Sequence, residues 1–184
     1  MSSALLLIDV QASFPQRPYW NPQELGRWPE AQRELVDLAK ASGIPLVRIF
    51  HLAPGSGGAF DPDKGFVKPL PGFEDPAVAT FYKTAHNAFT DTGLDRWLRG
   101  RGITTLWISG IRTEQCCETT ARVGADLGYD VVFVAEATLT FSMSRAGRVF
   151  SAAEIRERTE LVLDGRFARV VPVSALHNER CELA

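Results

Sequence analysis

Short apolar runs of six to eight residues alternate along the chain with longer segments in which apolar residues recur at helical spacing. The apolar runs are typical of strands buried on both faces and cover residues 4–9, 45–50, 78–83, 104–110, 130–137 and 168–173. The segments of helical spacing cover residues 22–42, 93–102, 115–128 and 151–165. This alternation predicts an α/β fold with three layers (α/β/α), in which helices cover both faces of a mostly parallel, six-stranded, Rossmann-like sheet. We expect a single domain over residues 1–184.

Two segments between these elements lack periodicity. Residues 51–77 are rich in glycine and proline, and loops of this length in a compact domain are usually functional or disordered. We expect residues 55–73 within this loop to shape a ligand pocket, either in their own subunit or in a neighbouring one. Residues 138–150 are expected to form a second loop.

Three residues with useful chemistry follow different predicted strands. Asp9 ends the first strand, Lys83 ends the third, and Cys116 begins the helix after the strand at 104–110. The carboxyl ends of parallel strands meet at one edge of a sheet, so these side chains are expected to converge there. A carboxylate, an amine and a thiol together suit nucleophilic catalysis, because a thiol is mostly protonated at neutral pH and needs activation.

Each of these residues also has a plainer interpretation. Asp9 fits a turn cap, Lys83 fits a solvated lysine at a sheet edge, and a buried cysteine is more often a core residue than a nucleophile. Cys116 is closer than Cys117 to the predicted helix N-terminus, where the helix dipole and Lys83 favour a thiolate. Cys117 points about 100° away on a helix and is expected to be inert.

The composition argues against several classes of protein. The 20 Lys and Arg are balanced by 22 Asp and Glu without clustering, so we expect a small-molecule substrate and neither nucleic acid nor membrane as a partner. Apolar runs are too short to span a bilayer, and we expect a cytoplasmic protein. The three cysteines form no CxxC pair, and the histidines lack metal-ligand spacing, so neither a metal nor another cofactor is expected.

Three segments resemble motifs of the isochorismatase-like cysteine hydrolase superfamily. Residues 5–14, LLLIDVQASF, resemble its opening strand with Asp-x-Gln and a following Phe. Residues 83–103, KTAHNAFTDTGLDRWLRGRGI, resemble its lysine segment and the next helix. Residues 108–138, ISGIRTEQCCETTARVGADLGYDVVFVAEAT, resemble its Gly-[Val/Ile]-x-Thr-x-x-Cys block. The three motifs occur in the family order and cover most of the chain.

The resemblance implies a catalytic triad of Asp9, Lys83 and Cys116. It also implies a cis peptide bond between Ile111 and Arg112, so that the backbone N–H groups of Arg112 and Cys116 form an oxyanion hole. In this chemistry Asp9 moves the thiol proton, and Lys83 holds the carboxylate in place.

Residues beside the triad in the sequence are candidates for substrate contacts. Gln11 and Asn87 are expected to bind polar atoms of the substrate, and Phe14 and Phe89 to wall the pocket. The resemblance further implies a homodimer or a homotetramer.

Two departures from family patterns narrow the expected activity. Metal-dependent nicotinamidases carry an Asp-x-His metal motif, whereas this chain has IFHLAP with a lone His51. Isochorismatases that cleave a vinyl ether do not use a cysteine nucleophile, so Cys116 favours cleavage of a C–N bond in a small amide, carbamoyl or ureido compound. The alternatives are an enol-ether hydrolase in which Cys116 is a bystander, and a non-catalytic module that binds small molecules or senses thiols.

Overall fold

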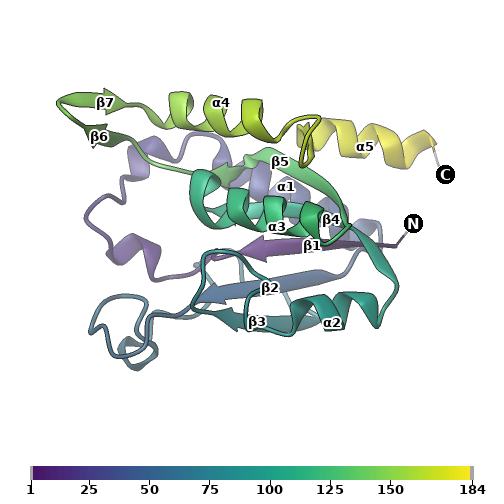
Figure 1. Ribbon diagram of the computed structural model, residues 1–184, viewed down its shortest axis with the longest axis horizontal. Helices are drawn as coiled ribbons and strands as arrows, with labels where there is room; N and C mark the ends of the chain where they lie inside the picture. The colour runs from purple at the N-terminus through teal and green to yellow at the C-terminus, as the bar shows by residue number, and fades with distance from the viewer. Residues whose placement is uncertain (1, 183–184) are drawn as a thin grey trace.

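A parallel six-stranded sheet forms the centre of the protein (Figure 1). The computed structural model describes residues 2–182, and the side chains of residues 2–178. The strand order is β3-β2-β1-β4-β5-β8, and every pairing within this sheet is parallel. The strands are β1 (Ser2–Ile8), β2 (Leu46–His51), β3 (Ala79–Lys83), β4 (Ile103–Ile111), β5 (Asp130–Leu139) and β8 (Arg169–Val171). The predicted α/β class and six-stranded sheet are confirmed.

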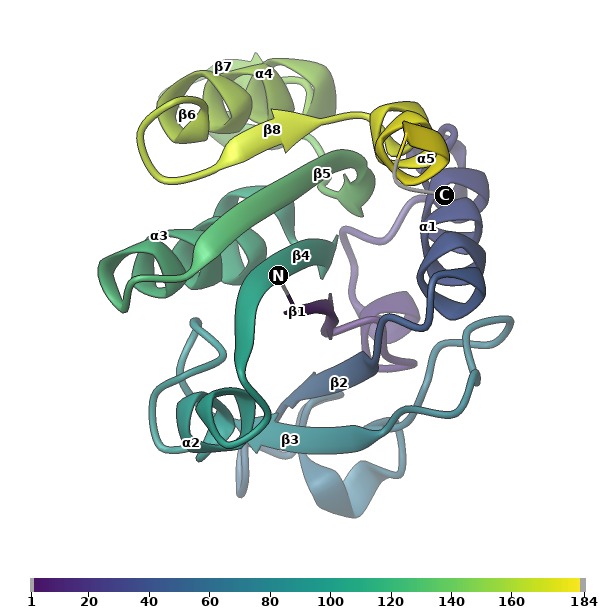
Figure 2. The same ribbon diagram turned by 90° about the vertical axis from the view of Figure 1, so that its right-hand side faces the viewer.

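Helices cover both faces of this sheet. On one face lie α1 (Trp28–Ala41) and α5 (Val173–Glu182), and on the other lie α2 (Leu94–Arg99), α3 (Glu118–Asp126) and α4 (Ala152–Leu163) (Figure 2). The chain reverses strand order between β1 and β4, which are neighbours in the sheet. Ligands of doubly wound sheets bind beyond the carboxyl ends of the strands at such a point. The fold therefore directs attention to the tips of β1 and β4.

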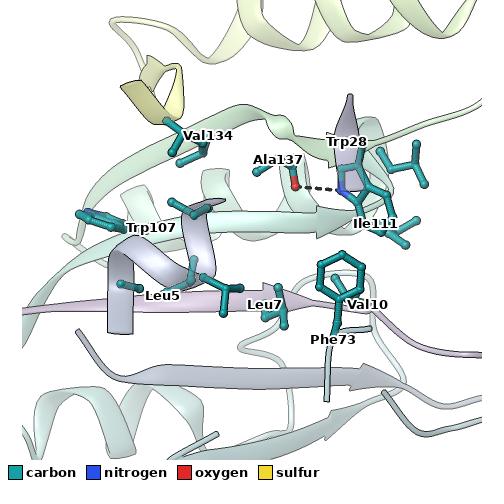
Figure 3. Packing of buried hydrophobic residues seen from close by; sticks show 14 of the residues in the cluster. Leu5, Leu7, Val10, Trp28, Phe73, Trp107, Ile111, Val134 and Ala137 are labelled. Atoms are coloured by element: carbon teal, nitrogen blue, oxygen red, sulfur yellow. Dashed lines mark hydrogen bonds between the residues drawn. The ribbon is translucent and has the colours of Figure 1, made fainter. Parts of the chain in front are cut away.

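The alternation of side chains along β1 builds both halves of the core. Leu5 and Leu7 pack with residues of α1, while Leu6 and Ile8 pack on the opposite face with residues of α2 and α3. On the α1 side, the Trp28 indole Nε1 donates a hydrogen bond to the carbonyl oxygen of Ala137, 3.1 Å away (Figure 3). This bond satisfies the polar atom of a buried tryptophan.

Hydrogen bonds hold the glycine- and proline-rich loop, residues 51–77, against the sheet. The amide of Ala12 donates to the carbonyl of Lys68 at 2.9 Å, and the amide of Leu70 donates to the carbonyl of Val10 at 3.1 Å. Further along, the buried Arg48 guanidinium donates to the carbonyl oxygens of Phe73 at 2.8 Å and Asp75 at 2.9 Å. The loop therefore runs beside the tip of β1 along a defined path.

The hairpin after β5 and the length of the last strand differ from what the sequence pattern predicts. Residues 143–150, expected to be a loop, form an antiparallel hairpin of β6 (Met143–Arg145) and β7 (Arg148–Phe150). Its two strands pair only with each other, and most of its side chains are exposed, so they lack the apolar pattern of the central strands. The last strand is also shorter than predicted, because α5 begins at Val173. No helix in the described part of the chain is both long and apolar enough to cross a bilayer.

Helix α1 begins later than its sequence pattern predicts. A 3₁₀ turn at Pro22–Glu24 comes first, and α1 starts at Trp28 with Pro29 in its first turn. Proline is well tolerated there because the first helical N–H groups have no partner within the helix.

At Gly110 the backbone of β4 packs closely against the backbone of β1. Its φ is +128°, and a Cβ at this position would lie 1.9 Å from the carbonyl oxygen of Ile8. We expect Gly110→Ala to destabilise the protein by about 4 kcal/mol or more, or to prevent folding, because backbone atoms on both strands would have to move. Urea unfolding of the purified variant measures the loss.

Gly128→Ala is the matched control for this prediction. Gly128 also has a positive φ, +88°, but nothing lies within 4 Å of the place that a Cβ would take there. Its substitution should cost only about 1 to 2 kcal/mol, from backbone strain alone. Equal losses in the two variants would show that the contact with Ile8 is not what requires glycine at position 110.

Candidate active site

The side chains of Asp9, Lys83 and Cys116 meet at the carboxyl edge of the sheet. The ammonium Nζ of Lys83 lies 2.8 Å from Oδ2 of Asp9 and 3.3 Å from Sγ of Cys116. All three residues are buried, with Cys116 the most accessible at 7%. The convergence predicted from the strand order is therefore present, with the lysine in contact with both other groups.

The three strands on one side of the sheet set this geometry. Asp9 follows β1 and Lys83 ends β3, while β2 lies between these strands. Lys83 pairs in register with His51, the last residue of β2, so its side chain reaches across the tip of β2 to Asp9. The ammonium thereby passes 3.4 Å from Nδ1 of His51 and also contacts the carbonyl oxygen of Ala85 at 3.3 Å.

Asp9 itself stands in an unusual backbone conformation. Its φ is +52°, in the left-handed region, which aspartate tolerates better than most residues. Its amide donates to the carbonyl of Ile49 at 2.9 Å, and its carbonyl accepts from the amide of Gln11 at 2.8 Å. Backbone hydrogen bonds thus hold the turn that aims the carboxylate at Lys83.

Cys116 lies in a wide turn that precedes helix α3. Residues Thr113–Cys117 form one π-helical turn, and α3 starts at Glu118, so the regular helix begins three residues later than its predicted start at residue 115. The peptide bond between Ile111 and Arg112 is cis, as the family resemblance implies. The Arg112 carbonyl accepts hydrogen bonds from the amides of Gln115 and Cys117, each at 3.2 Å, which closes the turn around Cys116.

The electrostatic environment keeps the resting Cys116 protonated. Burial and the negative charge of Asp9 raise the pKa of the Cys116 thiol, and the positive charge of Lys83 only partly opposes them. Lys83 therefore favours the thiolate as expected, but its effect on the thiol pKa is smaller than the combined effect of burial and Asp9. Burial by itself lowers the pKa of Lys83, but the charge of Asp9 and the hydrogen bonds to Asp9 and Cys116 outweigh it and raise that pKa overall.

One carboxylate oxygen is available to receive the thiol proton. Oδ2 of Asp9 is engaged by Lys83, whereas Oδ1 is buried and has no hydrogen-bond donor in the described part of the chain. A buried acceptor without a donor is costly, and a catalytic role is one explanation for such a group. Asp9 can therefore act as the base that a protonated Cys116 needs.

The neighbouring Cys117 has a different environment. It is fully buried among apolar residues of the α3 face, including Ala121, and burial raises the pKa of its thiol well above the ordinary value. This agrees with the expectation that Cys117 is a core residue.

A cavity of about 350 Å³, at the small end of the range for ligand pockets, opens onto Asp9 and Cys116, with Lys83 behind them and outside the lining. Its walls come from the tips of β1 and β2, from the segment after β1, from the first half of the long loop and from the π-helical turn. The lining residues are Asp9, Phe14, Arg17, Tyr19, His51, Ala53, Ser56, Gly58, Ala59, Phe60, His86, Gln115 and Cys116. The long loop thus contributes to the pocket of its own chain.

The four predicted substrate contacts divide into one inside the cavity and three outside its lining. Phe14 lines the cavity and packs edge-to-face against Phe60, with ring centroids 5.1 Å apart. Gln11 does not line it, because its fully buried amide donates to the carbonyl of His51 at 3.1 Å and accepts from the His51 amide at 2.8 Å. Gln11 therefore joins the tips of β1 and β2.

Asn87 and Phe89 also lie outside the cavity lining. The Asn87 side chain closes a local turn, accepting from the amides of Phe89 and Thr90 at 2.9 Å each. The Phe89 ring stacks on Tyr129, with centroids 5.9 Å apart, and packs against the core on the α3 face. Both residues shape the segment after β3 instead of facing a substrate.

Several lining residues have no counterpart among the sequence candidates. His51 directly follows the predicted strand at 45–50 and ends β2 beside β3, so the reasoning from strand ends that found Asp9 also applies to it. Arg17, Tyr19 and Gln115 lie in loops or turns, and only the folded chain shows that they face the cavity.

His51 and His86 both line the cavity, and His51 lies beside the Lys83 ammonium. Burial and then the charge of Lys83 lower the pKa of His51, so its ring is neutral at neutral pH. The rings of His51 and His86 are 6.2 Å apart between centroids. Within the described residues, no three His, Cys, Asp or Glu side chains are grouped to hold a metal ion. The nearby ammonium also opposes a second cation at Nδ1 of His51.

The sequence of this chain matches a known family over nearly its whole length. Residues 3–166 match the family model of the isochorismatase domain. The chain belongs to the isochorismatase family. Family membership makes this protein a hydrolase and confirms the resemblance found in its three motifs.

Individual members of the isochorismatase family support the same placement. The uncharacterized isochorismatase family protein YrdC of Bacillus subtilis (strain 168) is 28% identical over 96% of this chain and 95% of its own length. Nicotinamidase 3 of Arabidopsis thaliana is 33% identical over 95% of this chain and 86% of its own length. The crystal structure of an isochorismatase from Pseudomonas putida KT2440 superposes with a TM-score of 0.83 at 28% identity, covering 94% of this chain and 89% of that one.

Removing the charge of Asp9 and removing the charge of Lys83 should shift the pKa of the Cys116 thiol in opposite directions. Asp9→Asn removes the negative charge that raises the thiol pKa, so the pH–rate profile for alkylation by iodoacetamide should move to lower pH. Lys83→Met removes the opposing positive charge, so the profile should move to higher pH. Mass spectrometry of the labelled peptide measures the rate at Cys116 and distinguishes it from Cys117.

Thermal unfolding must show that both variants are folded at the labelling temperature, because each leaves a buried partner without its counter-charge. Shifts in the same direction would contradict this account of the electrostatics.

Proposed function

We propose that this protein hydrolyses a C–N bond of a small amide, carbamoyl or ureido compound through a thioester on Cys116, without a metal ion. The observation that carries the proposal is the shared ammonium: Lys83 contacts both the Asp9 carboxylate and the Cys116 sulfur, and these two residues line a cavity. A nucleophile, a base and a group that orients both are thereby within contact distance.

In the first half of the proposed reaction, Asp9 accepts the proton of the Cys116 thiol while the sulfur attacks the carbonyl carbon of the substrate. The C–S bond forms, and the electron pair of the carbonyl double bond moves to oxygen. When the tetrahedral intermediate collapses, the C–N bond breaks, and Asp9 returns the proton to the leaving nitrogen. The raised pKa of Cys116 supports this order, because the proton leaves only when a base takes it.

In the second half, water attacks the thioester carbon and Asp9 accepts a proton from that water. The C–S bond breaks, and Cys116 recovers a proton as the acid product leaves. Lys83 stays protonated throughout, since its pKa is raised by the charges beside it. It holds the carboxylate and balances negative charge on the sulfur.

The oxyanion of each tetrahedral intermediate is assigned in this proposal to the backbone N–H groups of Arg112 and Cys116. Arg112 directly precedes the π-helical turn Thr113–Cys117 that contains Cys116, which supports the assignment of both N–H groups to one site. Two such donors are typically worth about 3 kcal/mol each in transition-state stabilisation. The relationship to a nicotinamidase, which is an amidohydrolase, also supports C–N bond cleavage.

The proposal is tested by ammonia release from a panel of small amides, N-carbamoyl amino acids and ureido acids. We expect the native protein to turn over members of this panel, and Cys116→Ala to lower kcat by about 10⁴-fold or more. Cys117→Ala is the matched control, because it removes the adjacent sulfur from the core and leaves the cavity lining intact. It should retain activity within a few-fold of the native protein.

Two results would count against this function. Turnover of an isochorismate-like enol ether that persists in Cys116→Ala would identify an ether hydrolase in which the sulfur takes no part. Silence of the folded native protein across the whole panel, with Cys116 alkylated no faster than Cys117, would favour a binding module.

A further inference from the structure

The cavity contains one cationic side chain that the proposed chemistry does not use. Arg17 is the only Lys or Arg among the residues that line it. Asp9 is the only Asp or Glu among them, and its charge is already balanced by Lys83. The lining therefore carries an uncompensated positive charge at Arg17.

The Arg17 guanidinium is free to bind a ligand. It is exposed and forms no side-chain hydrogen bond or ion pair with the described part of the chain, and it lies over the Tyr19 ring, 5.6 Å from the ring centroid. Arg112 contacts the same ring at 5.1 Å, but it is buried and lies 3.1 Å from the carboxylate of Glu114. Of the two guanidiniums on Tyr19, only that of Arg17 lacks an anionic partner.

The position of Arg17 is set by the segment after β1. Its amide donates to the carbonyl of Phe14 at 2.9 Å, and its carbonyl accepts from the amide of Trp20 at 3.0 Å. Tyr19 in turn packs against the buried Phe141, with ring centroids 5.6 Å apart. The guanidinium thus rests on an anchored aromatic ring, which limits the freedom that it loses when it binds a ligand.

We infer that the substrate carries a carboxylate, which Arg17 binds at the open side of the cavity while the scissile group lies against Cys116. The difference in exposure sets which end of the substrate enters first, because Asp9 and Cys116 are buried and Arg17 is exposed. A guanidinium binds a carboxylate through two parallel hydrogen bonds, which suits recognition of an acid. This inference rests on the proposed function and narrows it to acid amides, N-carbamoyl amino acids and ureido acids.

Paired substrates test this inference directly. Each pair shares its scissile group and differs only at the remote end: a monoamide of a dicarboxylic acid against the amide with a methyl group in place of the carboxylate, and N-carbamoyl-β-alanine against N-propylurea. We expect the native protein to favour the acid in kcat/KM. Arg17→Gln should lower kcat/KM for the acid by about 10- to 100-fold, mainly through KM, and leave the neutral member within two-fold. Arg17→Lys should recover part of the loss.

Arg101→Gln is the matched control. Arg101 is also an exposed arginine on an aromatic ring, 4.0 Å from the Trp97 centroid, but it precedes β4 at the opposite edge of the sheet. Arg101→Gln makes the same change in net charge as Arg17→Gln and should leave the preference for the acid unchanged. An equal loss in both variants would show a general charge effect and overturn the assignment to Arg17.

Covalent labelling separates failure of this inference from failure of the proposed function. The rate at which 3-maleimidopropionate labels Cys116 is compared with that of N-propylmaleimide, and the ratio is normalised to the same ratio for glutathione. We expect the native protein to favour the anionic reagent and Arg17→Gln to lose that preference. If no amide is turned over but the labelling preference is present and depends on Arg17, the anion site stands and the proposed function fails. The inference would be overturned if the native protein showed no preference for acid over neutral compounds, either in kcat/KM or in the labelling rate of Cys116.

Discussion

The ion pair between Lys83 and Asp9 is the contact on which the rest of the site depends. Both groups are buried, and the lysine crosses the tip of β2 to reach the aspartate. Removing one partner of such a pair typically costs about 3 to 5 kcal/mol, because the other charge is left buried without compensation. The register of β1, β2 and β3 must therefore be correct before the carboxylate, the ammonium and the sulfur can meet.

This arrangement explains why the thiol is kept protonated at rest. A thiolate beside the Asp9 carboxylate in a buried site would place two negative charges around one ammonium. The structure instead holds one charge on Asp9 and leaves its Oδ1 without a donor. The proton can then move from sulfur to carboxylate without a change in the total charge of the buried group, which limits the electrostatic cost of the transfer.

The expectation that residues at strand ends converge predicted the centre of the site, because it requires only that the strands be parallel. Asp9 directly follows β1, Lys83 ends β3, Cys116 lies in the turn after β4, and His51 likewise ends β2. Nearby positions in the sequence were a poorer guide: Asn87 and Phe89 lie close to Lys83 in the chain, yet local turn bonds and core packing direct them elsewhere. The hairpin at residues 143–150 escaped prediction because its strands have no buried face, and Arg17 because only the path of its loop brings it to the cavity.

Hydrogen bonds anchor the long loop at both of its ends. The stretch between these anchors lines the cavity, whereas the reacting groups come from other segments. Gln11 ties the start of the loop to β1 through the backbone of His51, and Arg48 holds its far end through the carbonyls of Phe73 and Asp75. Between these anchors, residues 53–60 form part of the cavity wall without supplying any of the three converging groups. Divergence of this stretch can thus change which molecules are admitted while the reaction centre is inherited intact, a modular route by which one scaffold acquires new specificities.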